Sequence, residues 1–104
     1  MKVLNSILKE ELERLIELRK KYEHDMSKFP KGSLIKKDIK GHIYYYLNYR
    51  DGEKKHYKYL GNLNKDELAK WNKNIKERRK LRQSHIQVKK DIKRMEIIVG
   101  RAAR

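Results

Sequence analysis

The chain has 104 residues and no cysteine, and 29 Lys/Arg against 14 Asp/Glu leave a formal net charge of +15. The length fits one domain at most, and the absence of thiols excludes disulfides, thiolate zinc sites and cysteine nucleophiles. The amino-terminal stretch becomes acidic within ten residues and no long apolar run follows, so the sequence predicts a cytoplasmic protein with neither a signal peptide nor a membrane span.

Positive charge is concentrated in two blocks of the sequence. Residues 31–59 hold eight Lys/Arg and three Asp/Glu, net +5, and residues 73–94 hold ten and two, net +8. Residues 1–30 hold seven and six, so their net charge is only +1. Such an uneven distribution is typical of a protein that binds a polyanion.

Residues 1–28 are predicted to form a helix. Apolar residues recur at spacings of three and four on one helical face, and both signs of charge occupy the rest. These apolar residues are Leu4, Leu8, Leu12, Leu15, Leu18, Tyr22 and Met26, flanked by Ile7 and Ile16. The pattern indicates a scaffolding helix. It should end at Phe29-Pro30, because proline cannot continue the backbone hydrogen-bond ladder.

Residues 31–61 predict a three-stranded antiparallel meander, with strands at about 33–39, 42–49 and 54–60. Lys40-Gly41 and Asp51-Gly52 are each predicted to form a two-residue turn, and Asp-Gly is a strong hairpin signal because a type I′ turn needs positive φ at both central positions. Two such turns define the register of the strands. The predicted pairs are Ile35 with Tyr46, Ile39 with His42, Tyr46 with Tyr57, and Tyr44 with Tyr59.

This register divides the sheet into two faces, each partly apolar and partly basic. One face carries Ile35, Lys37, Ile39, His42, Tyr44, Tyr46, Lys55, Tyr57 and Tyr59. The other carries Leu34, Lys36, Ile43, Tyr45, Leu47, Tyr49, Lys54, His56, Lys58 and Leu60. A three-stranded sheet is marginal alone, so one face must pack on the helices. The residue pattern leaves open which face that is.

A long basic helix is predicted over residues 64–99, followed by a tail at 100–104. Asn64 can cap its first turn, and Glu67 can complete a capping box. The apolar stripe of the helix is Leu68, Trp71 and Ile75, then Leu81, His85, Val88, Ile92, Met95 and Val99. The four-three spacing of its second part is typical of a coiled-coil seam.

The predicted fold is therefore α+β in a single domain, residues 1–104: an amino-terminal helix, a three-stranded antiparallel meander and a long carboxy-terminal helix. The long helix either pairs with the first helix of the same chain in a helical hairpin or pairs with a second copy in a homodimeric coiled coil.

Six tyrosines and eight basic residues alternate between residues 31 and 60. Exposed tyrosine rings can stack on unpaired bases while lysines follow the phosphates, or a β-ribbon can enter the major groove of duplex DNA. Alternatively, Tyr44, Tyr46, Tyr57 and Tyr59 form the core against the helices, because tyrosine is a good strand former.

The residues predicted to bind nucleic acid lie in both basic blocks. In the sheet they are Lys36, Lys37, Lys40, Tyr44, Tyr46, Arg50, Lys54, Lys55, Tyr57 and Lys58, and in the helix they are Arg78, Arg79, Arg82, Lys89, Lys90 and Lys93. Within residues 73–94, only Glu77 and Asp91 offset the cations. This imbalance favours phosphate contact over a merely solvated face, an acidic protein or a membrane surface.

No residue set in the sequence points to catalysis. The four histidines have no metal-binding spacing and no accompanying carboxylate pair, and no serine sits in a nucleophile motif. Glycine-rich phosphate loops are also absent. The sequence therefore predicts a protein that is not an enzyme, with no catalytic residue, no metal and no cofactor.

The meander carries a recurrent set of short motifs. They are Lys31-Gly32-Ser33-Leu34, Ile39-Lys40-Gly41, Tyr44-Tyr45-Tyr46-Leu47, Tyr49-Arg50-Asp51-Gly52 and Tyr59-Leu60-Gly61. This set resembles a module in small uncharacterised bacterial, archaeal and phage proteins, and more loosely it is similar to the N-terminal strands of some transposases and integrase arm-type DNA-binding domains. Integrase-like modules place a short helix after the strands, whereas a long one follows here. The resemblance implies a phage or mobile-element origin.

The expected partner is nucleic acid, either DNA or RNA, and no membrane partner is expected. The first alternative is a phage- or element-encoded inhibitor, for example of the anti-CRISPR type, that docks on a host nucleoprotein complex. The second is a coiled-coil adaptor, which would form a stable homodimer without affinity for polyanions.

Overall fold

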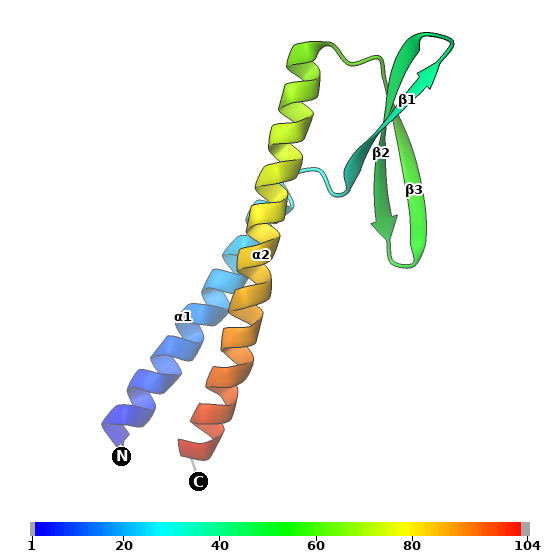
Figure 1. Ribbon diagram of the computed structural model, residues 1–104. Helices are drawn as coiled ribbons and strands as arrows, with labels where there is room; N and C mark the ends of the chain where they lie inside the picture. The colour runs from blue at the N-terminus through cyan, green and yellow to red at the C-terminus, as the bar shows by residue number, and fades with distance from the viewer. Residues whose placement is uncertain (1, 103–104) are drawn as a thin grey trace. The chain divides into compact units, whose positions relative to one another are not determined.

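The computed structural model describes residues 2–102 and has the predicted α+β architecture, with one helix on each side of the meander in the sequence (Figure 1). Its elements are α1 (Lys2–Met26), β1 (Ser33–Ile39), β2 (His42–Asp51), β3 (Lys54–Gly61) and α2 (Lys65–Ala102). The three strands form one antiparallel sheet in the order β1-β2-β3. Within residues 2–102, neither helix combines the length and the apolar character needed to cross a membrane.

Both ends of α2 can be compared with the prediction. At its start the Asn64 side-chain oxygen accepts a hydrogen bond from the Glu67 backbone amide at 2.8 Å, which confirms Asn64 as the cap. At its end the helix continues through Gly100 to Ala102, so the predicted tail is wrong for residues 100–102. A single glycine costs a helix only about 1 kcal/mol and need not end it. Residues 103–104 of the predicted tail lie outside the described residues.

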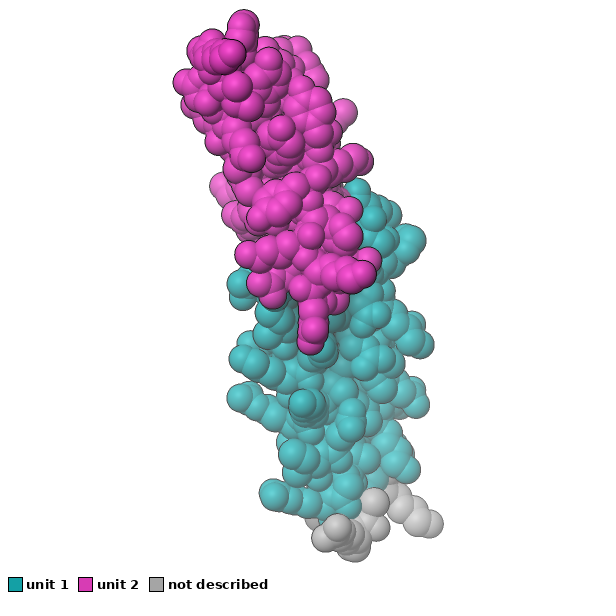
Figure 2. All heavy atoms as spheres, turned by 90° about the vertical axis from the view of Figure 1, so that its right-hand side faces the viewer, with its two compact units in different colours: residues 1–28, 80–104 teal, residues 29–79 magenta. Residues whose placement is uncertain are grey.

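The chain forms two compact units (Figure 2). The helical unit comprises residues 1–28 and 80–104, and the sheet unit comprises residues 29–79. The sheet unit therefore contains the whole meander and the first part of α2, whereas the rest of α2 belongs to the helical unit. Each unit has its own buried side chains.

The helical unit has its core between α1 and the second part of α2. The buried residues are Leu15, Val88 and Ile92, and Leu12, Ile16, Leu18, Tyr22 and Met95 pack against them. The helices run antiparallel, because Glu23 near the end of α1 meets His85 while the earlier Leu15 packs with the later Ile92. The predicted seam thus forms within one chain. At the start of α1 the predicted stripe is uncovered, since Leu4 and Ile7 are 50% and 56% exposed.

In the sheet, the first hairpin has the predicted register and the second does not. Ile35 pairs with Tyr46 and Ile39 with His42, and the turn between them has positive φ at both Lys40 and Gly41. Both observations confirm the predicted two-residue turn at Lys40-Gly41, and the two positive φ values are those of type I′.

The predicted Asp51-Gly52 turn is wrong. Asp51 belongs to β2 and pairs with Lys54, so the turn residues are Gly52 and Glu53. Of these two, only Gly52 has a positive φ, 63°, which is the pattern of a type II′ turn with glycine first.

The different turn shifts the pairing of β2 with β3 by two residues. Tyr46 pairs with Tyr59 instead of Tyr57, and Tyr57 pairs with Asn48. The ladder also has an irregularity between Tyr45 and Tyr46. Because side chains alternate with a period of two, a shift by two residues leaves each tyrosine on its predicted face.

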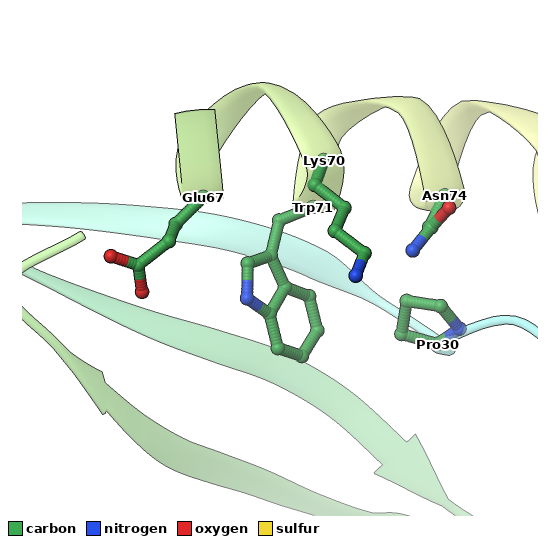
Figure 3. Close-up of a pocket in the computed structure, with 5 residues that line it drawn as sticks. All are labelled: Pro30, Glu67, Lys70, Trp71 and Asn74. Carbon is green, nitrogen blue, oxygen red and sulfur yellow. The ribbon is translucent and has the colours of Figure 1, made fainter. Parts of the chain in front are cut away.

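The structure determines which face of the sheet is covered. Leu47 is only 6% exposed, and it lines a cleft together with Tyr49, Lys58 and Trp71 of α2. Figure 3 shows the Trp71 side chain directed from α2 toward the strands, with Pro30 beside it. Ile75, one helical turn after Trp71, is also buried. The face that carries Leu47 and Tyr49 is therefore the helix-facing side, and the opposite face carries the paired tyrosines Tyr46 and Tyr59.

Candidate nucleic-acid interface

The opposite side of the sheet, called here the open face, is not packed by the helix of its own unit. The strand register and the alternation of side chains assign to it Ser33, Ile35, Lys37, Ile39, His42, Tyr44, Tyr46, Asn48, Arg50, Lys55, Tyr57 and Tyr59. Tyr57 and Tyr59 are 59% and 57% exposed, and Ile39 is 48% exposed. The alternative that Tyr44, Tyr46, Tyr57 and Tyr59 form the core against the helices is therefore wrong, because the core of this unit lies on the Leu47 side of the sheet.

An aromatic cluster occupies the middle of the open face. The ring centroid of Tyr59 lies 5.3 Å from that of Tyr46 and 6.3 Å from that of Tyr44, with interplanar angles of 49° and 44°. His42 extends the cluster, 6.4 Å from Tyr44. Tilted pairs at these distances are favourable, so the rings hold one another in place. With Ile39, the three tyrosines line a shallow hollow that opens to solvent.

Cations border this aromatic cluster. The Lys37 ammonium lies 5.1 Å from the ring centroid of Tyr46, which is a cation–π distance. Toward the second turn, Arg50 of β2 is paired directly with Lys55 of β3. Of the strand acids that the structure describes, Asp38 and Asp51 pair with Ile43 and Lys54 on the other side of the sheet. The open face thus combines aromatic rings with three cations and, over β1, β2 and β3, no carboxylate.

The structure does not bring all ten predicted sheet residues to one surface. Six of them lie on the open face: Lys37, Tyr44, Tyr46, Arg50, Lys55 and Tyr57. Lys36, Lys54 and Lys58 lie on the helix-facing side, and Lys58 lines the cleft beside Trp71. Lys40 occupies the first turn. The predicted register already placed Lys37 and Lys55 on the face of these tyrosines and Lys36, Lys54 and Lys58 on the other face, but it left open which of the two faces is exposed.

Arg78 and Arg79 of α2 belong to the sheet unit, and they differ in their surroundings. Arg78 is partly buried, and its guanidinium donates a hydrogen bond to the backbone carbonyl of Phe29 at 3.1 Å. This bond joins α2 to the segment that precedes the sheet, which gives Arg78 a structural role. Arg79 is exposed.

The other predicted helix residues, Arg82, Lys89, Lys90 and Lys93, are exposed in the helical unit. Arg82, Lys89 and Lys93 are spaced by seven and four residues, so they lie on one face of α2. This face is separate from the seam, which contains Val88 and Ile92. The helical unit therefore has a cationic stripe of its own.

At the edge of the seam, Glu23 contacts His85. The His85 ring nitrogen lies 3.1 Å from a Glu23 carboxylate oxygen. This hydrogen bond is the main cause that lowers the pKa of Glu23, desolvation opposes it, and the charges of His85, Arg19 and Lys89 lower the pKa further. The arrangement keeps a negative charge at the helix pair.

Sequence reasoning left Tyr59, the central ring of the cluster, out of the predicted site. The alternation of Tyr57 and Tyr59 along one strand was the available signal, because it places both rings on the same face. The predicted turn paired Tyr59 with Tyr44, and the observed pairing with Tyr46 reveals its central position. His42 and Ile39 complete the cluster and were also missed as site residues.

Comparison with known proteins places the chain in a family without an assigned activity. No curated protein and no solved structure matches the chain, so the similarity to transposase and integrase strands stays an expectation. A family model matches residues 6–70, which include most of α1, the whole sheet and the first turns of α2. The match ends before the cations at 78–93. The chain belongs to this family, described as a domain of unknown function, DUF6788.

Proposed function

We propose that the protein is a non-enzymatic nucleic-acid-binding protein that contacts phosphates through the cations of the open face and of α2. The observation that carries this proposal is the composition of the open face, where exposed tyrosines stand among Lys37, Arg50 and Lys55 and where β1, β2 and β3 place no carboxylate. Aromatic planes and unbalanced positive charge are the features with which proteins bind nucleic acid without an enzymatic site.

Burial in the core does not explain the residues on the open face. Tyr57 and Tyr59 leave more than half of their surface in water, so they add little to the hydrophobic core. Arg50 and Lys55 lie directly opposite each other, and like charges in that position destabilise a sheet. An anionic partner would turn both features into favourable contacts.

The cationic stripe of the helical unit supports the same proposal independently. Arg82, Lys89 and Lys93 are exposed on one face of α2. They lie outside the region that matches the family. When lysine and arginine side chains contact phosphates, the counterions condensed on the nucleic acid are released. This release favours binding at low salt.

The test is a binding panel of single- and double-stranded DNA and RNA, measured by gel shift and by fluorescence anisotropy between about 50 and 200 mM salt. The logarithm of the binding constant should fall linearly with the logarithm of the salt concentration. A binding constant that does not change over this range would contradict the proposal.

A pair of matched triple variants locates the contact. Lys37→Gln, Arg50→Gln and Lys55→Gln remove three charges from the open face, whereas Lys36→Gln, Lys54→Gln and Lys58→Gln remove three from the helix-facing side. The first variant should weaken binding and reduce the salt slope by roughly 2 to 3, because each lost phosphate contact removes about 0.7 to 0.9 from it. The second should have the smaller effect. Equal losses would mean that the open face has no special role.

A second candidate is an interaction protein that docks on a nucleoprotein complex. The observation in its favour is a group of exposed aliphatic side chains in the helical unit, near the start of α1 and the end of α2: Val3, Leu4, Ile7, Ile97 and Ile98. Exposed aliphatic side chains that gather in one region are characteristic of protein contact sites. Stoichiometric capture of one protein after nuclease treatment, lost on Ile7→Ser with Ile97→Ser, would favour this candidate over direct binding.

A further inference from the structure

The four tyrosines of the open face are not equivalent as surfaces for stacking. Tyr57 and Tyr59 are more than half exposed, whereas Tyr44 and Tyr46 are partly buried. One side of the Tyr46 ring is also occupied by the Lys37 ammonium at 5.1 Å. Two rings, Tyr57 and Tyr59, are therefore available to a ligand, and Tyr44 and Tyr46 support Tyr59 from the side.

The spacing of these two rings restricts the conformation of a nucleic acid that could contact both. Tyr57 and Tyr59 are alternate residues of β3, so their Cα atoms lie about 6.6 Å apart along the strand. Neighbouring bases in a duplex are separated by about 3.4 Å along the helix axis. Adjacent bases that remain stacked on each other cannot each cover one ring, but adjacent bases of an extended single strand can.

One cation of the open face, Lys55, lies in line with the two rings on β3. On β3 the order along this face is Lys55, Tyr57, Tyr59, with two residues per step. Lys37 stands on the other side of the cluster, over Tyr46. A single strand with its bases on the two rings would therefore have Lys55 beside it on β3 and Lys37 across the aromatic cluster on β1, and β1, β2 and β3 place no carboxylate on this face.

We propose that the open face binds unpaired bases of an extended single-stranded nucleic acid, with Tyr57 and Tyr59 each stacking on one of two consecutive bases. This inference rests on the proposed function and specifies its substrate class. A second copy of the chain is a poor occupant, because two open faces would bring the cations Lys37, Arg50 and Lys55 of both copies together. Duplex DNA is a poor occupant because its bases remain stacked.

The experiment measures fluorescence anisotropy with three labelled probes of equal length: an oligouridylate, an oligodeoxythymidylate and a duplex. The variants are Tyr57→Leu and Tyr59→Leu, which keep an apolar side chain and remove the aromatic plane. Tyr59→Phe is the matched control because it keeps the ring. Circular dichroism melting of each variant checks that it is folded.

Both single-stranded probes, or one of them, should bind more tightly than the duplex. Each leucine variant should weaken single-strand affinity roughly tenfold to a hundredfold, as expected for the loss of one base–aromatic stack. The salt slope should stay unchanged, since no phosphate contact is removed. Tyr59→Phe should retain the wild-type affinity. Preference for the uridylate or the deoxythymidylate probe distinguishes RNA from DNA as the source of the bases.

Four results would overturn the inference. Tighter binding to the duplex would show that the protein does not require unpaired bases. Leucine variants that bind single strands as the wild type does, while the triple variant at Lys37, Arg50 and Lys55 loses binding, would remove the stacking role and leave the proposed function standing. Wild-type protein that binds none of the probes would contradict both this inference and the proposed nucleic-acid-binding function. Dimerisation in sedimentation that Tyr59→Leu abolishes would assign the face to a second copy instead.

Discussion

The ammonium nitrogen of Lys37 lies 5.1 Å from the ring centroid of Tyr46 on the open face of the sheet. Tyr46 in turn pairs across the strands with Tyr59, so the lysine stands beside the aromatic cluster. Its neighbour in the sequence, Lys36, pairs with Tyr45 and points to the other side of the sheet. The two adjacent lysines of β1 therefore carry the same charge but lie on opposite faces of the sheet.

Lys37→Gln should weaken nucleic-acid binding and reduce the slope of its salt dependence by about 0.7 to 0.9, because one phosphate contact is lost. It should also cost about 0.5 to 1 kcal/mol of folding free energy through the lost cation–π contact at an exposed site. Lys36→Gln is the matched control. It should change both the salt slope and the folding free energy less than Lys37→Gln does. Anisotropy titrations at several salt concentrations and urea denaturation measure the two effects. The same loss of affinity in both variants would contradict a specific role for the open face.

Leu47→Ala should destabilise the sheet unit by about 2 to 5 kcal/mol, because it leaves a cavity beneath Trp71 in a small core. Leu47 is 6% exposed, whereas Ile39 of the open face is 48% exposed. Ile39→Ala should therefore cost less than Leu47→Ala while removing a side chain that lines the aromatic hollow. Chemical denaturation followed by tryptophan fluorescence reports on this unit directly, since Trp71 lines the same cleft as Leu47. Similar costs for the two variants would mean that the open face is covered in solution.

Arg78→Gln should lower the stability of the sheet unit by about 1 to 3 kcal/mol. The variant removes the charged donor that satisfies the Phe29 carbonyl at 3.1 Å, and such hydrogen bonds are among the stronger ones. Arg79→Gln removes the same charge from the next, exposed position and should leave stability nearly unchanged. Thermal melting of the two variants makes the comparison. If Arg79→Gln weakens nucleic-acid binding while Arg78→Gln mainly lowers the melting temperature, the structural and binding roles of this cluster are separated.

Stability should depend on pH through Glu23. Its pKa is lowered in the folded protein, chiefly by the hydrogen bond with His85, so between the folded and unfolded pKa values the unfolded chain binds more protons at this position. The contribution is complete above the ordinary glutamate pKa and is lost as the pH falls through the lowered, folded-state value.

The melting temperatures of wild type and Glu23→Gln should therefore differ at neutral pH and converge in acid. Glu13→Gln is the control for loss of one negative charge from α1. A difference between wild type and Glu23→Gln that stays constant from neutral to acid pH would show that the carboxylate of Glu23 does not stabilise the helix pair.

The sequence by itself determined the order and nature of the elements. Periodic leucines predicted α1, Asn64 marked the start of α2, and the spacing of Val88 and Ile92 predicted the seam that packs on Leu15. These signals are local, because helix caps and apolar periodicity depend on residues within a few positions of one another. Lys40-Gly41 was sufficient to predict the first hairpin for the same reason.

The second turn could not be resolved locally. In the observed type II′ turn, Gly52 is the first central residue and has a positive φ. In the predicted type I′ turn, Gly52 would be the second central residue, and that position also requires a positive φ. The Asp-Gly motif is therefore compatible with two registers. Only the complete ladder, with Asp51 opposite Lys54, distinguishes them.

The choice of the buried face was decided by tertiary structure alone. Both faces of the meander mix aliphatic, aromatic and basic side chains, so their hydrophobicity was not decisive. Trp71 of α2, with Leu47 beneath it, covers one face and leaves Tyr57 and Tyr59 in solvent on the other. Burial of these large apolar groups requires residues that are distant in sequence to meet. The sequence therefore predicted a sheet rich in tyrosine and lysine, and the packing of one helix on it decided which of those residues are exposed to a partner.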